Sequence, residues 1–488
     1  MRVRLLQHAA PAGRIRCWLG AIDAAPAAPA LLVAGGQQIL PVAAHQAPGL
    51  GGAVRAWWFD FPAAGDTAVV ATIGGIEVAR RTLRPAAAPE VRHDCHILLA
   101  SCFHKPNRDD GRIRNTLLQV RKHCGGAPDV TVLMGDQVYL DLPALKPFPD
   151  QLDWMRDHCL RAYIDNWFDG EAFADLLDGA PFLLIADDHE MWNNAPESQV
   201  HIQNTWTAPG RGRWRQAAEE AYASFRSLPL QIAAATPAPL SELRIGPAYL
   251  VLLDLRWLRE ERSGATPWRA RLSRLQDLYK ELAAAMQRAD QSGAVPLLVL
   301  GQGLFRDATH SQKDFEQADY ADFAELCAAV VPPPGASRES RRILLCGDVH
   351  FGRVAFARDR RAQDPLAGLY EAFVSPLALV SGIPVLEHLS ALKFWDRWPR
   401  HSAPDLDGFG PFHKHTGFEQ PEVLQARTRN GSPRGGAPLG PAGLQGDQMA
   451  VLSLLGGGDR PTAAIHYFSI DGKPDSGMTV PLFPRELA

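Results

Sequence analysis

Short apolar runs that end abruptly in glycine and acidic residues are the feature that most constrains the fold of this chain. Residues 130–134 and 343–346 are such runs, and they are followed by Gly135-Asp136 and Gly347-Asp348. A continuous apolar run of this length, ended by glycine, is typical of a buried strand in an α/β sheet. Ligands of such sheets bind just beyond the carboxyl ends of the strands. We therefore expect an α/β fold with its functional side chains at these ends.

Two more predicted strands end in the same way. Residues 97–100 lead into the segment Ser-Cys-Phe-His, and residues 182–185 lead into Ala-Asp-Asp-His-Glu, with Asn193 and Asn194 close behind. Thiol, imidazole, carboxylate, phenol and amide groups together suit two cations of differing hardness. A single Gly-Asp after a strand is more often a turn closed by an Asx hydrogen bond. Because the pattern recurs at four strand ends, a metal site is the better interpretation.

The size and charge of the chain limit the classes of protein it can belong to. At 488 residues it exceeds the usual size of a single core, which favours two domains. Its 46% apolar and 21% charged residues are ordinary for a soluble globular protein. The net charge of −4 gives no basic surface for specific nucleic-acid binding. No apolar stretch approaches the length of a transmembrane segment.

Residues 1–90 differ from the rest of the chain in the pattern of their apolar residues. Short apolar runs at 30–34, 54–59 and 68–73 are separated by Gly and Pro, which predicts a small N-terminal β-sandwich. The segment Pro-Ala-Ala-Ala-Pro at residues 85–89 is typical of a linker. The predicted domains are therefore a β-sandwich over 1–90 and a catalytic domain over 91–488.

The N-terminus and the cysteines bear on the cellular compartment. The first residues carry charge but no sustained apolar segment, so we expect no secretory signal. Seven cysteines are an odd number, and Cys159, Cys327 and Cys346 fall in predicted core elements. Both observations suit a reducing compartment better than a disulfide framework. The sequence therefore predicts a cytoplasmic protein.

From residue 92 onward, predicted strands alternate with predicted helices, as in an α/β layer fold. Helices are predicted over 150–178, 214–228 and 269–291, and further strands over 251–254 and 296–300. Leu278 and Leu282 lie on one face of the last helix, where a core-facing stripe is favoured over a partner surface. The segments 449–454 and 463–470 are predicted to form a closing hairpin. Residues 427–448, rich in Gly, Pro and Arg, are either a flap near the site or a surface excursion.

The order of these motifs resembles a known family. Ser-Cys, Gly-Asp-Gln-x-Tyr-x-Asp, Asp-Asp-His-Glu with Asn-Asn, Gly-Gln and Gly-Asp-Val-His follow one another across about residues 92–385. This set is similar to the PhoD-like (alkaline phosphatase D) branch of the calcineurin-like metallophosphoesterases. The resemblance implies an α/β/β/α sandwich, often preceded by an immunoglobulin-like β-sandwich domain, and hydrolysis of phosphoesters by metal-activated water.

The same resemblance implies roles for individual residues. Asp136 would bridge two metals, and His189 would protonate the leaving oxygen or steady the phosphate. A thiolate and a phenolate at Cys102 and Tyr139 point to Fe³⁺, whereas carboxylate and amide oxygens favour Ca²⁺, with Mn, Mg or Zn as other options. Gln302, where the superfamily usually has histidine, argues against a purely Zn or Mn site. The implied metal ligands are Cys102, Asp136, Tyr139, Asp188, Asn193, Asp348 and His350.

Basic residues and two histidine clusters complete the set of candidates. Arg108, Arg256 and Arg259 follow predicted strand ends, and Arg108 and Arg256 are candidates for binding the substrate phosphate. Surface or structural ion pairing is the ordinary role of each such arginine. The clusters at residues 93–96 and 412–415 have no partner pair at the spacing of a structural zinc site.

Two functions of different kinds are consistent with these residues. The first is a binuclear metal-dependent phosphomonoesterase or phosphodiesterase. The alternative is a non-catalytic binding or scaffold protein that retains the metallophosphoesterase fold. A degenerate member of the family is expected to have lost ligands, and the set from Cys102 to His350 is intact, which favours the enzyme. The phosphoester itself, whether small or polymeric, is not specified by the sequence.

Overall fold

The structure is a computed structural model. It describes residues 1–23, 27–50, 52–86, 94–104, 111–142, 148–169, 171–199, 202–226, 239–260, 268–305, 317–332, 340–348, 352–374, 376–378, 412–424, 427–428, 447–456, 461–470 and 478–483.

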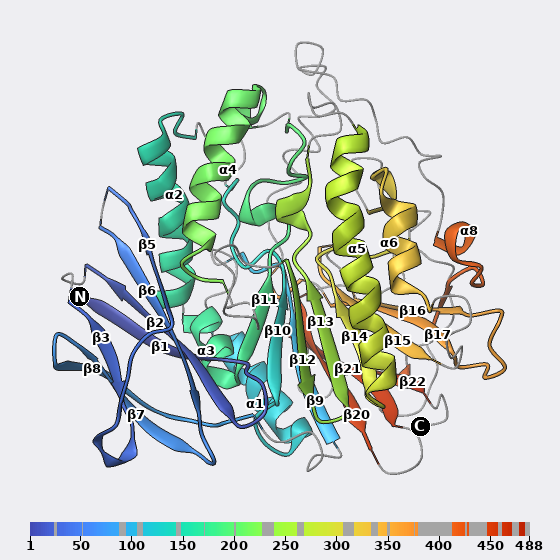
Figure 1. Ribbon diagram of the computed structural model, residues 1–488, viewed down its shortest axis with the longest axis horizontal. Coiled ribbons are helices and arrows are strands. Elements are labelled where there is room, and N and C mark those ends of the chain that lie inside the picture. Colours follow the sequence, from blue (N-terminus) through green and yellow to red (C-terminus); the bar gives the residue numbers. More distant parts are fainter. Residues whose placement is uncertain are drawn as a thin grey trace.

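Two large sheets form the centre of the molecule (Figure 1). The first has 11 strands in the order β19-β22-β21-β20-β9-β10-β11-β1-β2-β6-β5. Its strands are β19 (Arg427–Thr428), β22 (Met478–Phe483), β21 (Thr462–Ser469), β20 (Gln448–Leu455), β9 (Asp94–Ala100), β10 (Val130–Met134), β11 (Phe182–Ile185), β1 (Arg2–His8), β2 (Arg14–Ile22), β6 (Val54–Pro62) and β5 (Ala43–Ala47).

The second sheet faces the first, and a small third sheet lies near the N-terminus. The second has seven strands: β12 (Leu240–Ile245), β13 (Ala248–Leu253), β14 (Val295–Val299), β15 (Arg341–Cys346), β17 (Gly368–Phe373), β16 (Arg353–Arg358) and β18 (Glu422–Val423). The third has four: β4 (Gln38–Ile39), β3 (Pro29–Leu32), β7 (Thr67–Ile73) and β8 (Ile76–Leu83).

Helices cover the outer faces of the two large sheets. They are α1 (Arg112–Cys124), α2 (Leu152–Ile164), α3 (Glu171–Gly179), α4 (Ala208–Tyr222), α5 (Trp268–Gln291), α6 (Phe323–Val330) and α8 (Phe412–Thr416). In Figure 1 the N-terminal strands lie at the left of the molecule, and α5 and α6 lie to the right of its centre.

Three hydrophobic cores explain this layering. One lies between the two sheets, because strands such as β10 and β14 are apolar and buried on both faces. The second joins α1 to α4 to the outer face of the first sheet, and the third joins α5 and α6 to the outer face of the second. The predicted α/β/β/α sandwich is therefore confirmed.

Most of the predicted elements are present, with shifted ends in two helices. The predicted helix over 150–178 is broken into α2 and α3 by a π-helical turn at Asp165–Asp169. α4 begins at Ala208, earlier than predicted, because the Thr207 hydroxyl caps it by accepting from the Gly210 N–H at 3.2 Å. Leu278 and Leu282 are buried in the core, as predicted. The hairpin of β20 and β21 is also as predicted.

The N-terminal segment forms a β-sandwich, and one of its sheets continues into the central sheet. The small sheet packs its apolar face on β1, β2 and β6. β1 also pairs in parallel with β11, through His8 and Phe182, and the Ala9 N–H donates to the Phe182 carbonyl at 3.0 Å. The division into units 1–90 and 91–488 stays a prediction. The linker predicted at 85–89 and the loop predicted at 427–448 lie largely outside the described residues.

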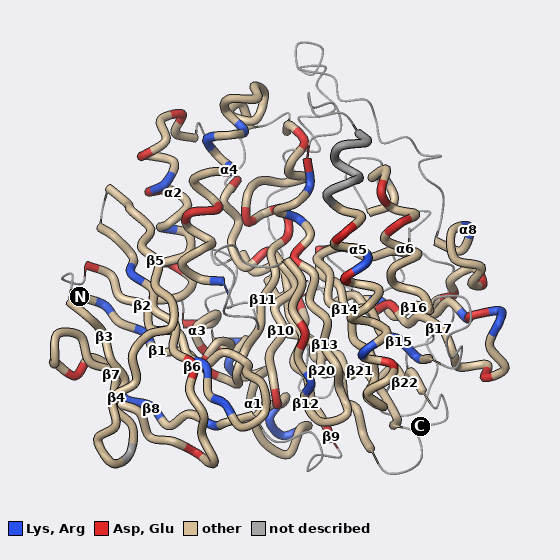
Figure 2. The backbone as a smooth tube through the Cα atoms, in the orientation of Figure 1, with Lys and Arg blue, Asp and Glu red and all other residues tan. Residues whose placement is uncertain are grey.

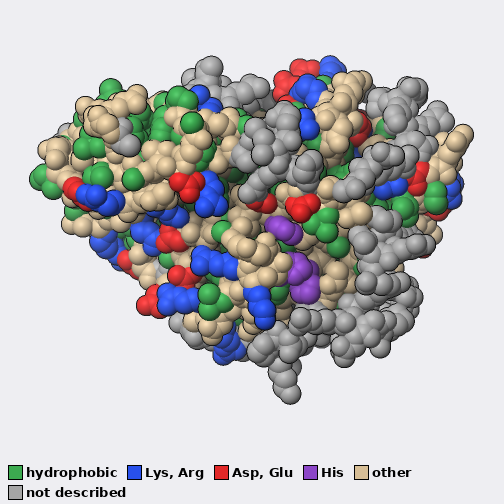
Figure 3. Space-filling view, turned by 90° about the horizontal axis from the view of Figure 1, so that it is seen from below, with side chains coloured by type: hydrophobic (Ala, Val, Ile, Leu, Met, Phe, Trp, Pro, Cys, Tyr) green, Lys and Arg blue, Asp and Glu red, His purple; other side chains and the backbone are tan. Residues whose placement is uncertain are grey.

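The described surface carries charges of both signs. In Figure 2 acidic residues gather near the middle of the molecule, above the upper ends of the central strands. On the face shown in Figure 3, Lys and Arg side chains alternate with Asp and Glu side chains, in keeping with the small net charge of −4. Among the described helices, none is both long and apolar enough to cross a bilayer.

His8 lies where the N-terminal strands join the central sheet. Its burial predicts that the protein becomes less stable as the pH is lowered. Its ring is buried against Phe182, with centroids 4.3 Å apart, and neither ring nitrogen has a hydrogen-bond partner in the described structure. Burial, with a smaller effect of Arg16, lowers the pKa of His8 from 6.5 to about 3. Between these pH values the unfolded chain therefore binds a proton that the folded chain does not.

We expect the free energy of unfolding to be highest above pH 6.5 and to fall as the pH is lowered toward 3. The contribution of His8 to this slope is at most about 1.4 kcal/mol per pH unit. His8→Phe should remove that contribution, so urea unfolding of the two proteins should diverge progressively between pH 6.5 and pH 4.5. Parallel pH dependences of the wild type and the variant would show that His8 does not carry the effect.

Candidate metal centre

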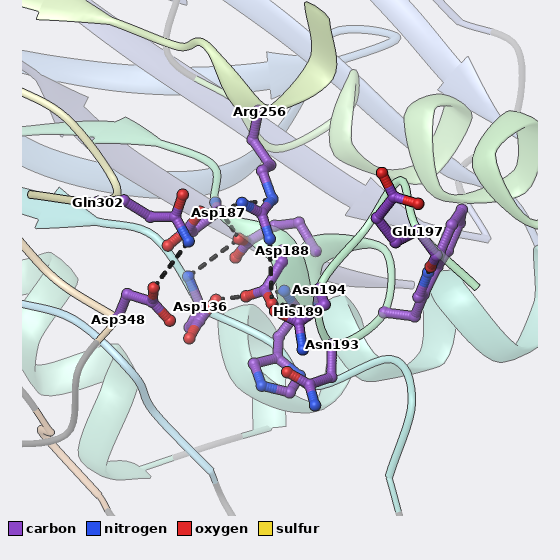
Figure 4. A network of polar contacts seen from close by, with 12 residues as sticks. Asp136, Asp187, Asp188, His189, Asn193, Asn194, Glu197, Arg256, Gln302 and Asp348 are labelled. Atoms are coloured by element: carbon purple, nitrogen blue, oxygen red, sulfur yellow. Dashed lines mark hydrogen bonds and ion pairs between the residues drawn. The ribbon is translucent and has the colours of Figure 1, made fainter. Parts of the chain in front are cut away.

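The candidate ligands lie where strands of both large sheets end. Cys102 follows β9 and Asp136 follows β10, while Asp187 and Asp188 follow β11. Asp348 follows β15, in the second sheet. Because β9, β10 and β11 are parallel neighbours, their carboxyl ends meet at one edge. Figure 4 shows the four aspartate side chains of this group pointing toward one another.

The backbone at these strand ends is strained. Cys102, Asp136, Asn194 and Asp348 all have positive φ values, between 56° and 66°. Asp23 is the only other residue besides glycine with positive φ in the described chain. Such conformations cost of order 1 kcal/mol or more and persist where the surroundings impose them. Their concentration at one place supports a functional site.

Two glycines allow the strand ends to approach each other closely. Gly135 has a φ of 94°, and a Cβ there would lie 2.4 Å from the Cβ of Asp187. A Cβ on Gly301, at the end of β14, would lie 2.7 Å from the Asp187 carboxyl carbon. Since neither position has room for a side chain, glycine is needed on both sides of Asp187.

The acidic side chains form two overlapping groups. Asp136, Asp188 and His189 make the first, and Asp187, Asp188 and Asp348 make the second. In each group, one potential ligand atom per residue lies within 4.8 Å of the others. Asp188 belongs to both groups, so it lies between two places where a cation could bind.

Burial makes the charged forms of these carboxyl groups unfavourable unless positive charge lies close to them. Burial, followed by the charge of Cys102, raises the pKa of Asp136 well above its ordinary value. Burial and the Asp348 carboxylate do the same for Asp187. Arg256 offers partial compensation through ion pairs of 3.2 Å to Asp188 and 3.7 Å to Asp187.

The donor set fits metal ions. Asp187 Oδ2 and Asp188 Oδ1 are buried and accept no hydrogen bond from any described group. Buried carboxylate oxygens without a donor are costly unless a cation binds them. Cations could therefore bind at this cluster, and its oxygen atoms suit hard ones.

His189 is held by Asp141. Its Nδ1 lies 2.7 Å from Asp141 Oδ1, and Asp141 Oδ2 accepts from the Asn193 N–H at 2.9 Å. Burial alone lowers the pKa of His189. The charges of Asp141, Asp188 and Asp136 together outweigh burial, so the pKa lies well above 6.5. The Nδ1 contact fixes the ring and leaves Nε2 as the nitrogen that can exchange a proton.

Cys102 and Tyr139 lie side by side at one edge of the cluster. The Cys102 thiol is 3.4 Å from Asp136 Oδ2. Burial, then the charges of Cys102 and Asp136, raise the pKa of Tyr139 well above 10, and the hydroxyl also hydrogen-bonds with Cys102. The Tyr139 ring packs 4.1 Å from the His189 ring. Thiol, phenol and carboxyl groups therefore converge at one point.

Glu190 holds two strand ends together. Its carboxylate accepts from the backbone N–H groups of Asp136 at 2.9 Å, Gln137 at 2.6 Å and Asp187 at 2.7 Å. Burial raises the pKa of Glu190 to about 8, and the three N–H donors act in the opposite direction. The three donors therefore offset part of the effect of burial on this carboxyl group.

The structure brings most of the predicted site residues into one cluster. Asn193 lies beside His189 in Figure 4, and its backbone N–H binds Asp141, while the neighbouring Asn194 N–H donates to Asp188 Oδ2 at 2.5 Å. Gln302 donates to Asp348 Oδ2 at 2.9 Å. Arg108 and His350 lie outside the described residues.

The other candidates have different positions. Arg259 is buried and pairs with Asp322 at 2.5 Å. His96, in β9, contacts Ser453 Oγ at 2.9 Å, and His413 and His415 are in α8. Neither histidine cluster contributes to a three-ligand group in the described part of the chain.

Sequence reasoning gave no role to three important acidic residues. Asp187 directly precedes Asp188, and because a 3-10 turn begins at Asp188, both side chains face the site. Asp141 and Glu190 stand within the quoted motifs, but their partners are distant in sequence. One sequence signal points to these three residues. The motifs contain more carboxylates than the predicted metal ligands account for.

Two facing mixed sheets lie between layers of helices, and acidic side chains gather at the ends of the central strands. A solved structure entitled "Structure of PhoD" is similar to this chain, with a TM-score of 0.54. It is 12% identical in sequence, and the match covers 98% of this chain and 91% of that one. No protein-family model matches the chain, and neither does any curated protein. The chain thus has the PhoD-like fold that its motifs predicted.

The contacts of Glu190 predict a large loss of stability in Glu190→Gln. Oε2 accepts two N–H groups, and Oε1 accepts one from Gln137. The amide nitrogen of glutamine cannot accept a hydrogen bond. If it takes the place of Oε1, the bond to Gln137 is lost, and if it takes the place of Oε2, two bonds are lost. We expect a cost of about 1–3 kcal/mol per lost bond, measured by urea unfolding. Glu77→Gln, on the exposed side of β8, should change stability by about 0.5 kcal/mol or less. Equal effects of the two substitutions would contradict the role of Glu190.

Proposed function

We propose that this protein is a metal-dependent hydrolase of phosphoesters, acting on phosphomonoesters, phosphodiesters or both. The observation that carries the proposal is a group of four aspartates at the carboxyl ends of strands from two sheets, of which three are buried and Asp348 is partly buried. The PhoD-like fold supports it, because that fold presents these strand ends at one edge.

Two metal ions are proposed to bind this cluster. Cys102 and Tyr139 would hold Fe³⁺, and Asp136 would be shared by both ions. Asp188, with a neutral oxygen from Asn193, would hold Ca²⁺, while Asp348 and His350 complete the set. Asp187 is added to this set because its Oδ2 atom has no donor among the described groups. When bound, the cations lower the pKa of a water molecule and neutralise phosphoryl oxygens.

His189 is proposed to protonate the leaving oxygen. Asp141 accepts the Nδ1 proton and so keeps the ring in one orientation, with the second proton on Nε2. The surrounding carboxylates favour the protonated ring, which is the form an acid needs. His189 is therefore poised to donate from Nε2 while Asp141 stabilises the charge.

Arg256 is proposed to bind the substrate phosphate. Its side chain is buried, and it approaches the carboxylates from the opposite side to His189 in Figure 4. None of its nitrogen atoms makes a hydrogen bond with a described group, and a guanidinium with unused N–H groups suits phosphate oxygens. Arg108 remains a second candidate for this role.

A cytoplasmic location is part of the same proposal. All seven cysteines have reduced thiols, and all but Cys124 are buried. Buried, reduced thiols suit a reducing compartment.

The proposal is tested by metal analysis of the purified protein and a screen of chromogenic phosphoesters. Turnover should require metal, be abolished by chelation, and return when metal is restored. A metal-bound protein that hydrolyses none of the phosphomonoesters and phosphodiesters would instead support a binding or scaffold protein.

Iron bound through Cys102 and Tyr139 should give the protein colour. A phenolate or thiolate bound to Fe³⁺ produces a charge-transfer band in visible light. Tyr139→Phe should remove or strongly shift this band, whereas Tyr249→Phe should leave it unchanged, because Tyr249 is the partly exposed residue of the otherwise buried β13. A colourless and active protein that contains only zinc would exclude iron at this position.

His189→Ala should slow turnover more than it lowers metal content. We expect kcat to fall by about 10²–10⁴-fold, the usual contribution of a general acid. The loss should be smaller for nitrophenyl esters, because nitrophenolate needs little protonation to leave. Asp141→Asn should lower kcat by a smaller factor, and this loss should likewise be smaller for nitrophenyl esters. If the loss were equal for all leaving groups, His189 would not be the acid.

A further inference from the structure

Glu371 is a fully buried carboxylate that the proposed reaction has not used. It lies in β17, on the same face as Leu369 and Phe373, because alternate residues of a strand share a face. Those two residues belong to the apolar core between the second sheet and its helices. A buried ion pair is often no more stable than apolar side chains of similar volume. A charged residue at this position therefore needs an explanation other than stability.

The carboxylate of Glu371 binds the segment of chain just beyond β14. Its Oε2 accepts the backbone N–H groups of Leu304 at 2.6 Å and of Phe305 at 2.8 Å. Its Oε1 accepts from Arg353 Nη2 at 3.0 Å, and the same nitrogen donates to the Phe305 carbonyl at 3.1 Å. Glu371 and Arg353, from the neighbouring strands β17 and β16, thus bind both backbone polar groups of Phe305.

The segment that Glu371 binds also carries Gln302, which contacts the candidate metal centre. Gln302 is buried, and its Nε2 donates to Asp348 Oδ2 at 2.9 Å, a bond that Figure 4 shows. The next residue, Gly303, packs directly against the carboxylate, because a Cβ there would lie 2.9 Å from Glu371 Oε2. The position of the Gln302 amide therefore depends on the contacts of Glu371.

We propose that Glu371 is a positioning residue of the metal centre, which fixes the segment after β14 so that the Gln302 amide orients the Asp348 carboxylate for metal binding. The inference rests on the proposed function and deepens it. Carboxylates that bind metals are in turn oriented by hydrogen bonds from neighbouring groups. Glu190 fixes the ends of β10 and β11 in the first sheet, and Glu371 fixes the end of β14 in the second.

The test measures metal affinity rather than turnover. The intact chain is stripped of metal by a chelator and titrated calorimetrically with Mn²⁺ and with Ca²⁺, ions that carboxylate ligands suit. Loss of a group that orients a metal ligand should weaken binding by about ten- to hundredfold in Glu371→Gln. Gln302→Ala should weaken binding by a similar factor, because it removes the bond to Asp348 directly.

The double variant separates positioning from a general structural role. If Glu371 acts through Gln302, adding Glu371→Gln to a protein that already carries Gln302→Ala should change metal affinity by no more than about twofold. Independent effects of the two substitutions would instead multiply, and that result would overturn the proposal.

A matched control is Asp60→Asn. Asp60 is also a buried carboxylate in a strand, and it accepts from Arg14 Nε at 2.6 Å and Arg16 Nε at 2.8 Å, but it lies in β6 among the N-terminal strands. This variant should lose stability and keep its metal affinity within about twofold of the wild type. If it weakens metal binding as much as Glu371→Gln does, the effect of Glu371 is only a loss of stability, and the proposal is wrong.

A second variant covers the case in which Glu371→Gln does not fold. Gly303→Ala keeps the ion pair of Glu371 with Arg353 and places a methyl group against it, so the same segment has to shift. Metal binding should weaken in this variant, and the weakening should be absent when Gln302→Ala is already present. Unchanged metal affinity in Gly303→Ala would contradict the proposal.

The outcomes distinguish the two proposals. If the wild type hydrolyses phosphoesters and Glu371→Gln binds metal within about twofold of it, the positioning role is wrong while the proposed function stands. If the wild type binds metal but hydrolyses no phosphoester, the proposed function fails, and the titrations still decide the role of Glu371. If the wild type binds neither Mn²⁺ nor Ca²⁺ and hydrolyses no phosphoester, both proposals are overturned.

Discussion

The carboxylate of Glu190 is the interaction on which the geometry of the site depends. It accepts three backbone N–H groups from the ends of β10 and β11, and so fixes the chain that carries Asp136 and Asp187. Strand ends have N–H groups that the sheet no longer satisfies, and burying them without an acceptor is costly. A single buried carboxylate therefore stabilises two loops and fixes their spacing. The positive φ of Asp136 can persist because the Glu190 carboxylate binds the N–H groups of Asp136 and Gln137.

Charge is the second constraint. Burial of several carboxylates together is unfavourable, and Arg256 is the only described cation in ion-pair contact with Asp187 and Asp188. Its contacts, at 3.2 Å and 3.7 Å, leave carboxylate oxygens with no donor among described groups. The folded chain thus pre-organises negative charge that metal ions can neutralise, and metal binding should stabilise the fold by linkage.

The sequence predicted the strands well because their apolar runs are continuous and end in glycine, as at Met134 and Gly135. It located the acidic cluster because the carboxyl ends of parallel strands must meet. It gave no role to Glu190 or Asp141, since their partners are set by tertiary contacts that local pattern does not encode. For the same reason, the pairing of β1 with β11 could not be anticipated. Backbone hydrogen bonds let an edge strand such as β11 pair with many sequences, so the tertiary fold decides which strand lies beside it.

The site also depends on both sheets at once. Asp136 and Asp187 come from the first sheet, while Asp348 and Gln302 come from the second. The two sheets approach each other closely at Asp187, because a Cβ on Gly301 of the second sheet would lie 2.7 Å from the Asp187 carboxyl carbon. Any change that separates the sheets, even far from the ligands, therefore moves one half of the cluster relative to the other. Because ligand positions must hold within about 0.5 Å, the tightly packed core between the sheets is as necessary to the site as the ligands themselves.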